Sequence, residues 1–303
     1  MRRERTMRNC AAALAACLLP MFAAPFGAYA AGPPDMSVGP QYDSTHVYVP
    51  PGALDAFVDS FVATFGGTPS KPIVTNVLPV PSRATFRYVM SPVGTLSVFA
   101  FQTPIPFPFG SERTGYLVRD MDKAVAAARE SGAEIIVEPF NDPIGRDAVV
   151  EWPGGVKTQL YWHFKAPSYP PLRSVPENRV YVSGDRADAF VHDFIGFSHG
   201  RIVSDDARAD AGAIGRPGET YRRIFIESGF GKMAVFVTDG HLPYPFGREV
   251  TGYEVAELDA TLARAKQSGA AVLVQPTDAG DRRTAMLQFP GGYIAEVHAV
   301  KTR

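Results

Sequence analysis

The chain has 303 residues, of which 46% are hydrophobic and 20% are charged. This composition is that of a folded globular protein, and the length is sufficient for two domains. The 30 Lys and Arg residues nearly balance the 31 Asp and Glu residues, so nothing in the net charge of −1 points to a nucleic-acid partner. The only cysteines, Cys10 and Cys17, lie in the first 20 residues, which excludes a disulfide framework or a cysteine metal site in the rest of the chain.

The N-terminal segment resembles an export signal. A basic stretch precedes an apolar, alanine-rich run that ends in Ala28-Tyr29-Ala30, and such a small-x-small pattern is typical of a signal-peptidase site. Two prolines interrupt the run, so we do not expect a transmembrane span. We expect residues 1–30 to be a cleaved signal peptide and residues 31–42 a flexible segment. The mature protein would be periplasmic or extracellular, or alternatively lipid-anchored through Cys17.

The rest of the chain is an internal duplication. PFPFGSERTGYLV (106–118) matches PYPFGREVTGYEV (243–255) at 9 of 13 positions, and WPGG (152–155) recurs as FPGG (289–292) at the same offset of 137 residues. Upstream, HVYVPPGALDAFVDSF (46–61) matches RVYVSGDRADAFVHDF (179–194) at an offset of 133. We therefore expect one domain over residues 43–165, a second over 178–301, and a stiff proline-rich linker over 166–177.

Each copy contains the same order of predicted elements twice. An alternating strand at residues 46–49 precedes an amphipathic helix over 54–65, in which apolar residues recur at helical spacing until Gly66-Gly67. Three runs of β-branched and aromatic residues follow, and then a strand at 114–118. A helix begins after Asp120, its expected N-cap, and three more strands complete the copy. The chain thus predicts an α+β fold of four βαβββ modules with curved mixed sheets.

This pattern resembles the vicinal oxygen chelate superfamily, which includes glyoxalase I, extradiol dioxygenases and bleomycin-binding proteins. The resemblance rests on the paired βαβββ modules, the Gly-Tyr-x-Val strand before a helix, and the closing PGG-x-x-x-E, and it covers residues 43–301. It implies two tandem glyoxalase-like domains. In metal-using members, each domain forms a cup that holds a divalent ion through residues on its first, fourth, fifth and eighth strands.

The residues at those positions are poor metal ligands. In the first domain they are His46, Val98, Arg113 and Gln159, and in the second they are Arg179, Val235, Val250 and Glu296. Valine has no lone pair to donate, and an arginine side chain stays protonated and has only donors. A divalent ion needs imidazole, carboxylate or carbonyl ligands. We therefore expect no cofactor in either domain taken alone.

An ion pair is expected where the second domain would hold its ion. Glu296 and His298 share one face of the last strand because strand side chains alternate, and Arg179 and Tyr181 lie on the first strand of the same cup. An Arg179–Glu296 pair would occupy the space of the ion. In the first domain we expect a cup with aromatic walls and a cationic donor, suited to a small anionic or carbonyl-bearing ligand. Its expected lining residues are His46, Tyr48, Arg113, Gln159, Tyr161 and His163.

One alternative keeps a metal. If the first module pairs with the fourth, His46 meets Glu296 and His298, a set that Fe, Zn or Mn could accept. The chain would then be a metal-dependent lyase or ring-cleaving dioxygenase. Otherwise we expect an exported, metal-poor module that binds a small molecule and is a monomer or homodimer. Whether it is an enzyme stays open at this point.

Overall fold

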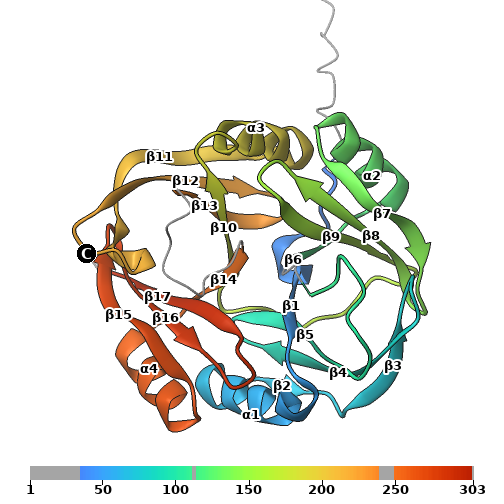
Figure 1. Cartoon of the computed structure of the whole chain (residues 1–303), viewed down its shortest axis with the longest axis horizontal. Helices are drawn as coiled ribbons and strands as arrows, with labels where there is room; N and C mark the ends of the chain where they lie inside the picture. Colours follow the sequence, from blue (N-terminus) through green and yellow to red (C-terminus); the bar gives the residue numbers. More distant parts are fainter. Residues whose placement is uncertain (1–34, 111–113, 239–248, 302–303) are drawn as a thin grey trace, which may run out of the picture. The chain divides into compact units, whose positions relative to one another are not determined.

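A computed structural model describes residues 35–110, 114–238 and 249–301. These residues form two curved mixed sheets with helices on their outer faces (Figure 1). The first sheet has the order β2-β4-β5-β1-β6-β9-β8-β7, with β3 paired to β4, and the second has the order β11-β12-β13-β10-β14-β17-β16-β15. The two orders correspond strand for strand, so the duplication in the sequence is a duplication of the fold. The predicted α+β arrangement of four modules is confirmed.

The elements of the first sheet and its helices are β1 (Ser44–Tyr48), α1 (Leu54–Phe65), β2 (Thr68–Pro69), β3 (Ile73–Val77), β4 (Ser82–Ser91), β5 (Gly94–Phe101), β6 (Thr114–Leu117), α2 (Met121–Glu130), β7 (Glu134–Asn141), β8 (Gly145–Trp152) and β9 (Val156–His163). The elements of the second are β10 (Glu177–Ser183), α3 (Ala187–Ser198), β11 (Arg201–Asp210), β12 (Thr220–Ser228), β13 (Gly231–Thr238), β14 (Glu249–Glu254), α4 (Leu258–Gln267), β15 (Ala271–Ala279), β16 (Arg282–Gln288) and β17 (Ile294–Val300). Short 3-10 helices are η1 (Pro40–Tyr42), η2 (Pro51–Ala53) and η3 (Ala211–Ile214).

The helices begin and end where local chemistry predicts. Asp120 caps α2, because its side chain accepts a hydrogen bond from the Lys123 backbone amide. Helix α1 ends at Gly66, whose φ of 82° lies in the region that favours glycine. Among the described residues, no helix is long and apolar enough to cross a membrane.

The two halves of the chain share their hydrophobic cores. Helix α1 packs beside α4, and α2 packs beside α3 (Figure 1). Phe57 of α1 meets Phe289 and Tyr293 of the second half at ring-centroid distances of 6.0 and 5.4 Å. Trp152 of the first half packs against Phe194 of α3 at 5.8 Å. Each helical layer therefore joins a module of one half to a module of the other.

Each module also ties its helix to its sheet with the same ion pair. An arginine on a strand reaches an aspartate in the first turn of the helix, and the aspartates are largely exposed, so each pair stabilises the fold by about 1 kcal/mol at most. The pairs are Arg87–Asp55, Arg146–Asp122, Arg222–Asp188 and Arg283–Asp259, with nitrogen–oxygen distances of 2.7 to 3.0 Å. The arginines that recur in the two sequence copies thus have a structural explanation.

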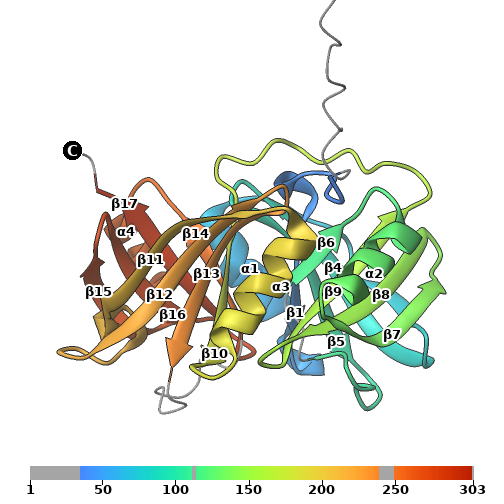
Figure 2. The ribbon, with the colours of Figure 1, turned by 90° about the horizontal axis from the view of Figure 1, so that it is seen from above.

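Two segments shape the inner faces of the sheets. The linker between β9 and β10 contains no helix and crosses one end of both sheets (Figure 2). The connection from β3 to β4 spans only residues 78–81, whereas its counterpart from β11 to β12 spans 211–219 and contains η3. Ala211, Ala213 and Ile214 of η3 are buried, and η3 packs against β15. The second sheet is therefore closed at a place where the first is not.

Candidate functional site

The inner face of the first sheet encloses a cavity of about 340 Å³, which we call the first cup. Its volume lies at the lower end of the range for small-molecule sites. Among the described lining residues are all of the expected ones except Arg113, which lies outside the described residues: His46, Tyr48, Gln159, Tyr161 and His163. The structure therefore brings together five side chains from β1 and β9 that the sequence analysis singled out.

One wall of the first cup is aromatic. Tyr48 stacks on Phe99 at 5.6 Å, Phe99 meets Phe86 at 4.9 Å, and Phe86 meets Tyr88 edge-on at 4.4 Å. The His46 ring is buried and stands perpendicular to Phe99, at 6.0 Å. These rings come from β1, β4 and β5 of the first module. They present a continuous apolar surface against which a flat molecule could lie.

The opposite wall is polar and comes from β8, β9 and the loop after β7. Gln159 donates a hydrogen bond to Asp147, and the Tyr161 hydroxyl donates to the Tyr42 carbonyl oxygen. Burial, together with the nearby charge of Asp142, raises the pKa of Asp147 to about 7, although the Gln159 hydrogen bond opposes this. Burial lowers the pKa of His163, and the charge of Asp142 opposes it. Near neutral pH, Asp147 can therefore carry a proton and donate a hydrogen bond to an acceptor in the cup.

Asp147 was missed by the sequence analysis, yet the duplication contains a signal for it. At the offset of 137 residues, Asp147 corresponds to Thr284 and Gln159 corresponds to Glu296. In the second sheet the Thr284 hydroxyl donates to the Glu296 carboxylate, while in the first Gln159 donates to Asp147. The carboxylate thus lies on β8 in the first copy and on β17 in the second. In each copy it accepts a hydrogen bond from a side chain on the neighbouring strand.

On the inner face of the second sheet, which we call the second cup, the side chains of the described residues pack against one another. Tyr181 and Tyr221 stack on Phe236 at 4.9 and 5.5 Å, and the guanidinium of Arg179 lies 4.4 Å from the centre of the same ring. Val250 completes this cluster together with residues of η3. The cup residues expected from the sequence, Arg179 and Tyr181, therefore face inward, and both pack against the Phe236 ring.

Buried charges occupy the centre of the second cup. Arg179 Nη1 lies 3.1 Å from Glu296 Oε1, and His298 Nδ1 lies 2.8 Å from Glu296 Oε2. Arg179 is 4% exposed, Glu296 0% and His298 2%. Burial would raise the pKa of Glu296, but the charges and hydrogen bonds of Arg179, His298 and Thr284 outweigh it and lower the pKa to about 2. The predicted Arg179–Glu296 ion pair is confirmed.

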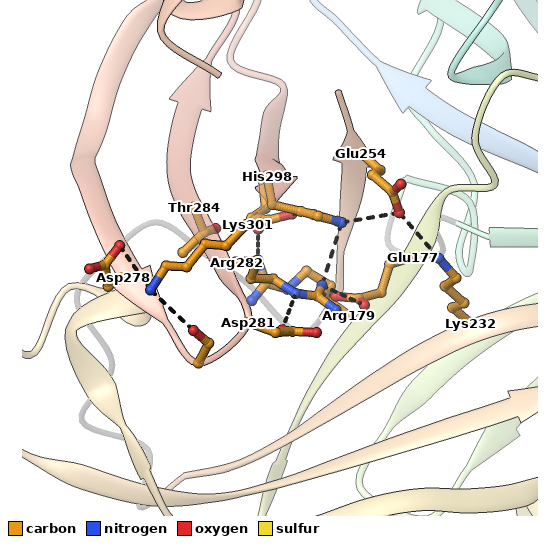
Figure 3. Close-up of polar contacts among 12 residues, drawn as sticks. Glu177, Arg179, Lys232, Glu254, Asp278, Asp281, Arg282, Thr284, His298 and Lys301 are labelled. Carbon is orange, nitrogen blue, oxygen red and sulfur yellow. Dashed lines mark hydrogen bonds and ion pairs between the residues drawn. The ribbon is translucent and has the colours of Figure 1, made fainter. Parts of the chain in front are cut away.

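A second ion pair supports the first. Arg282 Nη1 lies 3.0 Å from Glu177 Oε2, and Glu177 Oε1 lies 3.7 Å from Arg179 Nε. Figure 3 shows Arg179, Glu177 and Arg282 converging beneath His298. Two guanidinium groups thus face two carboxylates. The sequence analysis did not single out Glu177 or Arg282, because neither matches a ligand position of the family.

The structure corrects two of the expected cup positions. Val98 and Val235 point to the helical side of their sheets, where both are buried in the shared cores. The residues that pair with His46 and Arg179 across the parallel strands are Ser97 and Ala234. The expectation was displaced by one residue, and in a strand such a displacement moves a side chain to the opposite face.

The strand order also corrects the alternative cross-domain site. Strand β1 pairs with β5 and β6 in the first sheet, whereas β17 pairs with β14 and β16 in the second. His46 therefore lines the first cup, while Glu296 and His298 lie in the second. Modules one and four do associate, but through α1 and α4 rather than through a common sheet.

Comparisons with known proteins support the fold. No family model matches the sequence, and no curated protein does. Among solved structures, a mutant of 4-hydroxymandelate synthase from Streptomyces coelicolor matches with a TM-score of 0.58 and 14% identity, covering 88% of this chain and 93% of that one. A Mn(II)-bound glyoxalase from Novosphingobium aromaticivorans matches with a TM-score of 0.53 and 14% identity, covering 88% and 83%.

A third similar structure is the 2,2',3-trihydroxybiphenyl 1,2-dioxygenase from Sphingomonas wittichii, with a TM-score of 0.53, 12% identity, and coverage of 88% of this chain and 91% of that one. Since these three structures match over 88% of this chain, the chain shares their fold, which is the vicinal oxygen chelate fold that the sequence pattern predicts. At sequence identities of 12–14%, the structural similarity shows the fold alone. The activity has to be argued from this chain's own residues.

A divalent metal, which the fold family implies, does not fit the residues present. In the second cup, Arg179 offers donors and no acceptor, and the two buried carboxylates, Glu296 and Glu177, are already paired with Arg179 and Arg282. In the first cup, His46 is accompanied by an amide, Gln159, whose amide group is hydrogen-bonded to Asp147. Among the described residues, no three His, Cys, Asp or Glu side chains are grouped so that they could hold a metal ion.

Proposed function

We propose that the chain is a small-molecule-binding protein of the vicinal oxygen chelate fold that holds its ligand in the first cup. The observation that carries this proposal is the asymmetry between the duplicated halves. The first cup encloses about 340 Å³, whereas at the equivalent place in the second sheet, rings, an ion pair and η3 pack together. Retention of an open cup in one copy and a filled cup in the other favours binding at the first.

The ligand we propose is a compact, flat molecule that bears a carbonyl group. The aromatic wall of Tyr48, Phe86 and Phe99 suits a ring, and a protonated Asp147 beside it suits a carbonyl oxygen. The sequence also suggested an anionic ligand, on the strength of Arg113. The described lining residues include two acidic side chains, Asp142 and Asp147, and no Arg or Lys, so they favour the uncharged carbonyl compound over an anion.

We include export in the proposal, because residues 1–30 have the composition of a signal peptide. A binding protein without cysteines after Cys17 suits an oxidising compartment, where no thiol can mispair. We propose no catalytic step. The dioxygenase or lyase alternative required His46 and Glu296 in one site, and the strand order separates them.

The test is calorimetric titration of the mature protein with two probes that share a ring, 4-hydroxyacetophenone and 4-hydroxybenzoate. We expect the ketone to bind at one site per chain and the carboxylate to bind at least about tenfold more weakly. Ser97→Phe, which places a ring inside the cup, should abolish binding. His192→Ala changes an exposed helix residue and should bind like the wild type. No heat from either probe would refute the proposal.

A further inference from the structure

A second, smaller cavity lies between the two sheets. Its volume is about 30 Å³, which is room for one small ion or about two water molecules, and we call it the seam cavity. The strands that line it are β1 and β6 of the first sheet and β10 and β14 of the second. Its polar lining includes Asp43, Thr45, Thr114, Asn178 and Thr251.

Four of these side chains occupy equivalent places in the two halves. Thr45 pairs with Thr114 in the antiparallel ladder between β1 and β6, and Asn178 pairs with Thr251 in the corresponding ladder between β10 and β14. All four residues are buried, and the Thr251 hydroxyl donates to the Thr45 hydroxyl at 3.5 Å. The duplication therefore brings side-chain oxygens from both halves to one place.

Asp43, which directly precedes β1, adds a negative charge to this place. Both of its carboxylate oxygens are buried, and neither has a hydrogen-bond partner among the described residues. Burial raises the pKa of Asp43 well above its ordinary value, and the opposing effect of the Leu117 backbone amide does not offset this. Lys232 also lines the seam cavity, but its ammonium group lies 3.2 Å from Glu254. A buried carboxylate without a counter-charge is costly, so Asp43 needs a partner that the described side chains do not supply.

Asn178 carries a further acceptor without a donor. Its Nδ2 atom donates to the Tyr116 hydroxyl at 3.3 Å, whereas its buried Oδ1 atom has no hydrogen-bond partner among the described residues. The Thr114 hydroxyl donates to Glu249, so its own lone pairs are available to a cation. A proton on Asp43 would supply only one donor for three acceptor oxygens, and a water molecule would leave the carboxylate charge uncompensated. A small cation would contact these oxygens and balance the charge at once.

We infer that the seam cavity is a sodium site, with Asp43 and Asn178 as its principal ligands and the hydroxyls of Thr114 and Thr251 beside them. Hard cations take carboxylate, amide and hydroxyl oxygens as ligands. The single carboxylate in the described lining matches a single positive charge, and the small volume favours sodium over the larger potassium. The bound ion joins β1 and β6 of the first sheet to β10 and β14 of the second, so it stabilises the contact between the halves.

The experiment is thermal unfolding of the mature protein near neutral pH in sodium, potassium or choline chloride at equal ionic strength. A ligand that binds only the folded state raises the melting temperature, so we expect about 0.2 M sodium to give a value about 3–7 °C above that in choline. Potassium should give less than half of this gain. Equal melting temperatures in sodium and choline would overturn the inference, as would a larger gain in potassium than in sodium.

Variants then test the ligands. Asp43→Asn keeps the shape of the side chain and removes its charge, so the gain from sodium should vanish. Asp59→Asn, which removes one exposed carboxylate from α1, is the matched control and should keep the full gain. Thr251→Val removes one hydroxyl and should raise the sodium concentration that gives half of the gain by about tenfold. A gain that survives in Asp43→Asn, or an unchanged midpoint in Thr251→Val, would refute this site.

Discussion

The substitution Asp147→Asn should have a more favourable effect on stability, relative to the wild type, at pH 8 than at pH 5. Asp147 has a pKa of about 7 in the folded chain against an ordinary value of 3.8, mainly because it is buried. Between these two values the folded state holds a proton that the unfolded state has released, so the stability of the wild type falls as the pH rises from about 4 to about 7. Asparagine cannot ionise and removes this dependence.

The magnitude follows from the two pKa values. The full difference corresponds to about 4 kcal/mol, and the part that develops between pH 5 and pH 8 is about 2–3 kcal/mol. For a chain of this size that is about 5–10 °C in melting temperature. We therefore compare the melting temperature of Asp147→Asn with that of the wild type at each pH. We expect this difference to be higher at pH 8 than at pH 5 by about that amount.

The assay is thermal unfolding followed by circular dichroism at both pH values. Asp259→Asn is the matched control, because its carboxylate is exposed at the start of α4, and its effect should be the same at both pH values. If the effect of Asp147→Asn on stability is also independent of pH, the carboxyl group is not protonated near neutrality. The hydrogen bond that we assign to a ligand carbonyl would then have no donor.

Three further predictions concern packing and processing. Ser97→Phe places a ring in the open first cup and should change the melting temperature by less than about 3 °C. Ala234→Phe, at the equivalent position of the filled second cup, should lower the free energy of unfolding by about 1–3 kcal/mol. Equal effects of the two substitutions in thermal unfolding would mean that the cups do not differ. Phe289→Ala should cost about 3–5 kcal/mol and leave a single unfolding transition in calorimetry, because this ring packs against α1 of the other half; two separated transitions would show that the halves fold independently. Intact-mass analysis of secreted protein should give a chain that begins at Ala31, and a mass that retains residues 1–30 would refute cleavage there.

Much of the fold could be predicted because its signals are local or repeated. Apolar spacing predicted α1, the N-cap residue predicted the start of α2, and the duplication predicted that both sheets follow one plan. Alternation on the last strand placed Glu296 and His298 on one face, and the structure confirms their contact. The Arg179–Glu296 pair followed from the same alternation applied to two strands.

The site was harder to predict because it depends on long-range register. Nothing local determines whether Ser97 or Val98 faces the cup, since that is set by how β5 aligns with β1. Asp147 was missed because the charged residues of β8, which are Arg146, Asp147 and Glu151, match no motif by their spacing. The closure of the second cup by η3 could not be predicted either, because the additional residues between β11 and β12 indicate only a longer connection. Arg113 lies outside the described residues, and its role in the first cup stays a prediction.

The most direct test of this account is a crystal structure of the protein soaked with 4-bromoacetophenone, read through the anomalous signal of bromine. The account predicts one bromine peak per chain inside the first cup, between the aromatic wall and Asp147, and none among Arg179, Phe236 and Glu296. A peak in the second cup, or a first cup that stays empty at millimolar probe, would contradict the claim that only one of the two copies is built to bind.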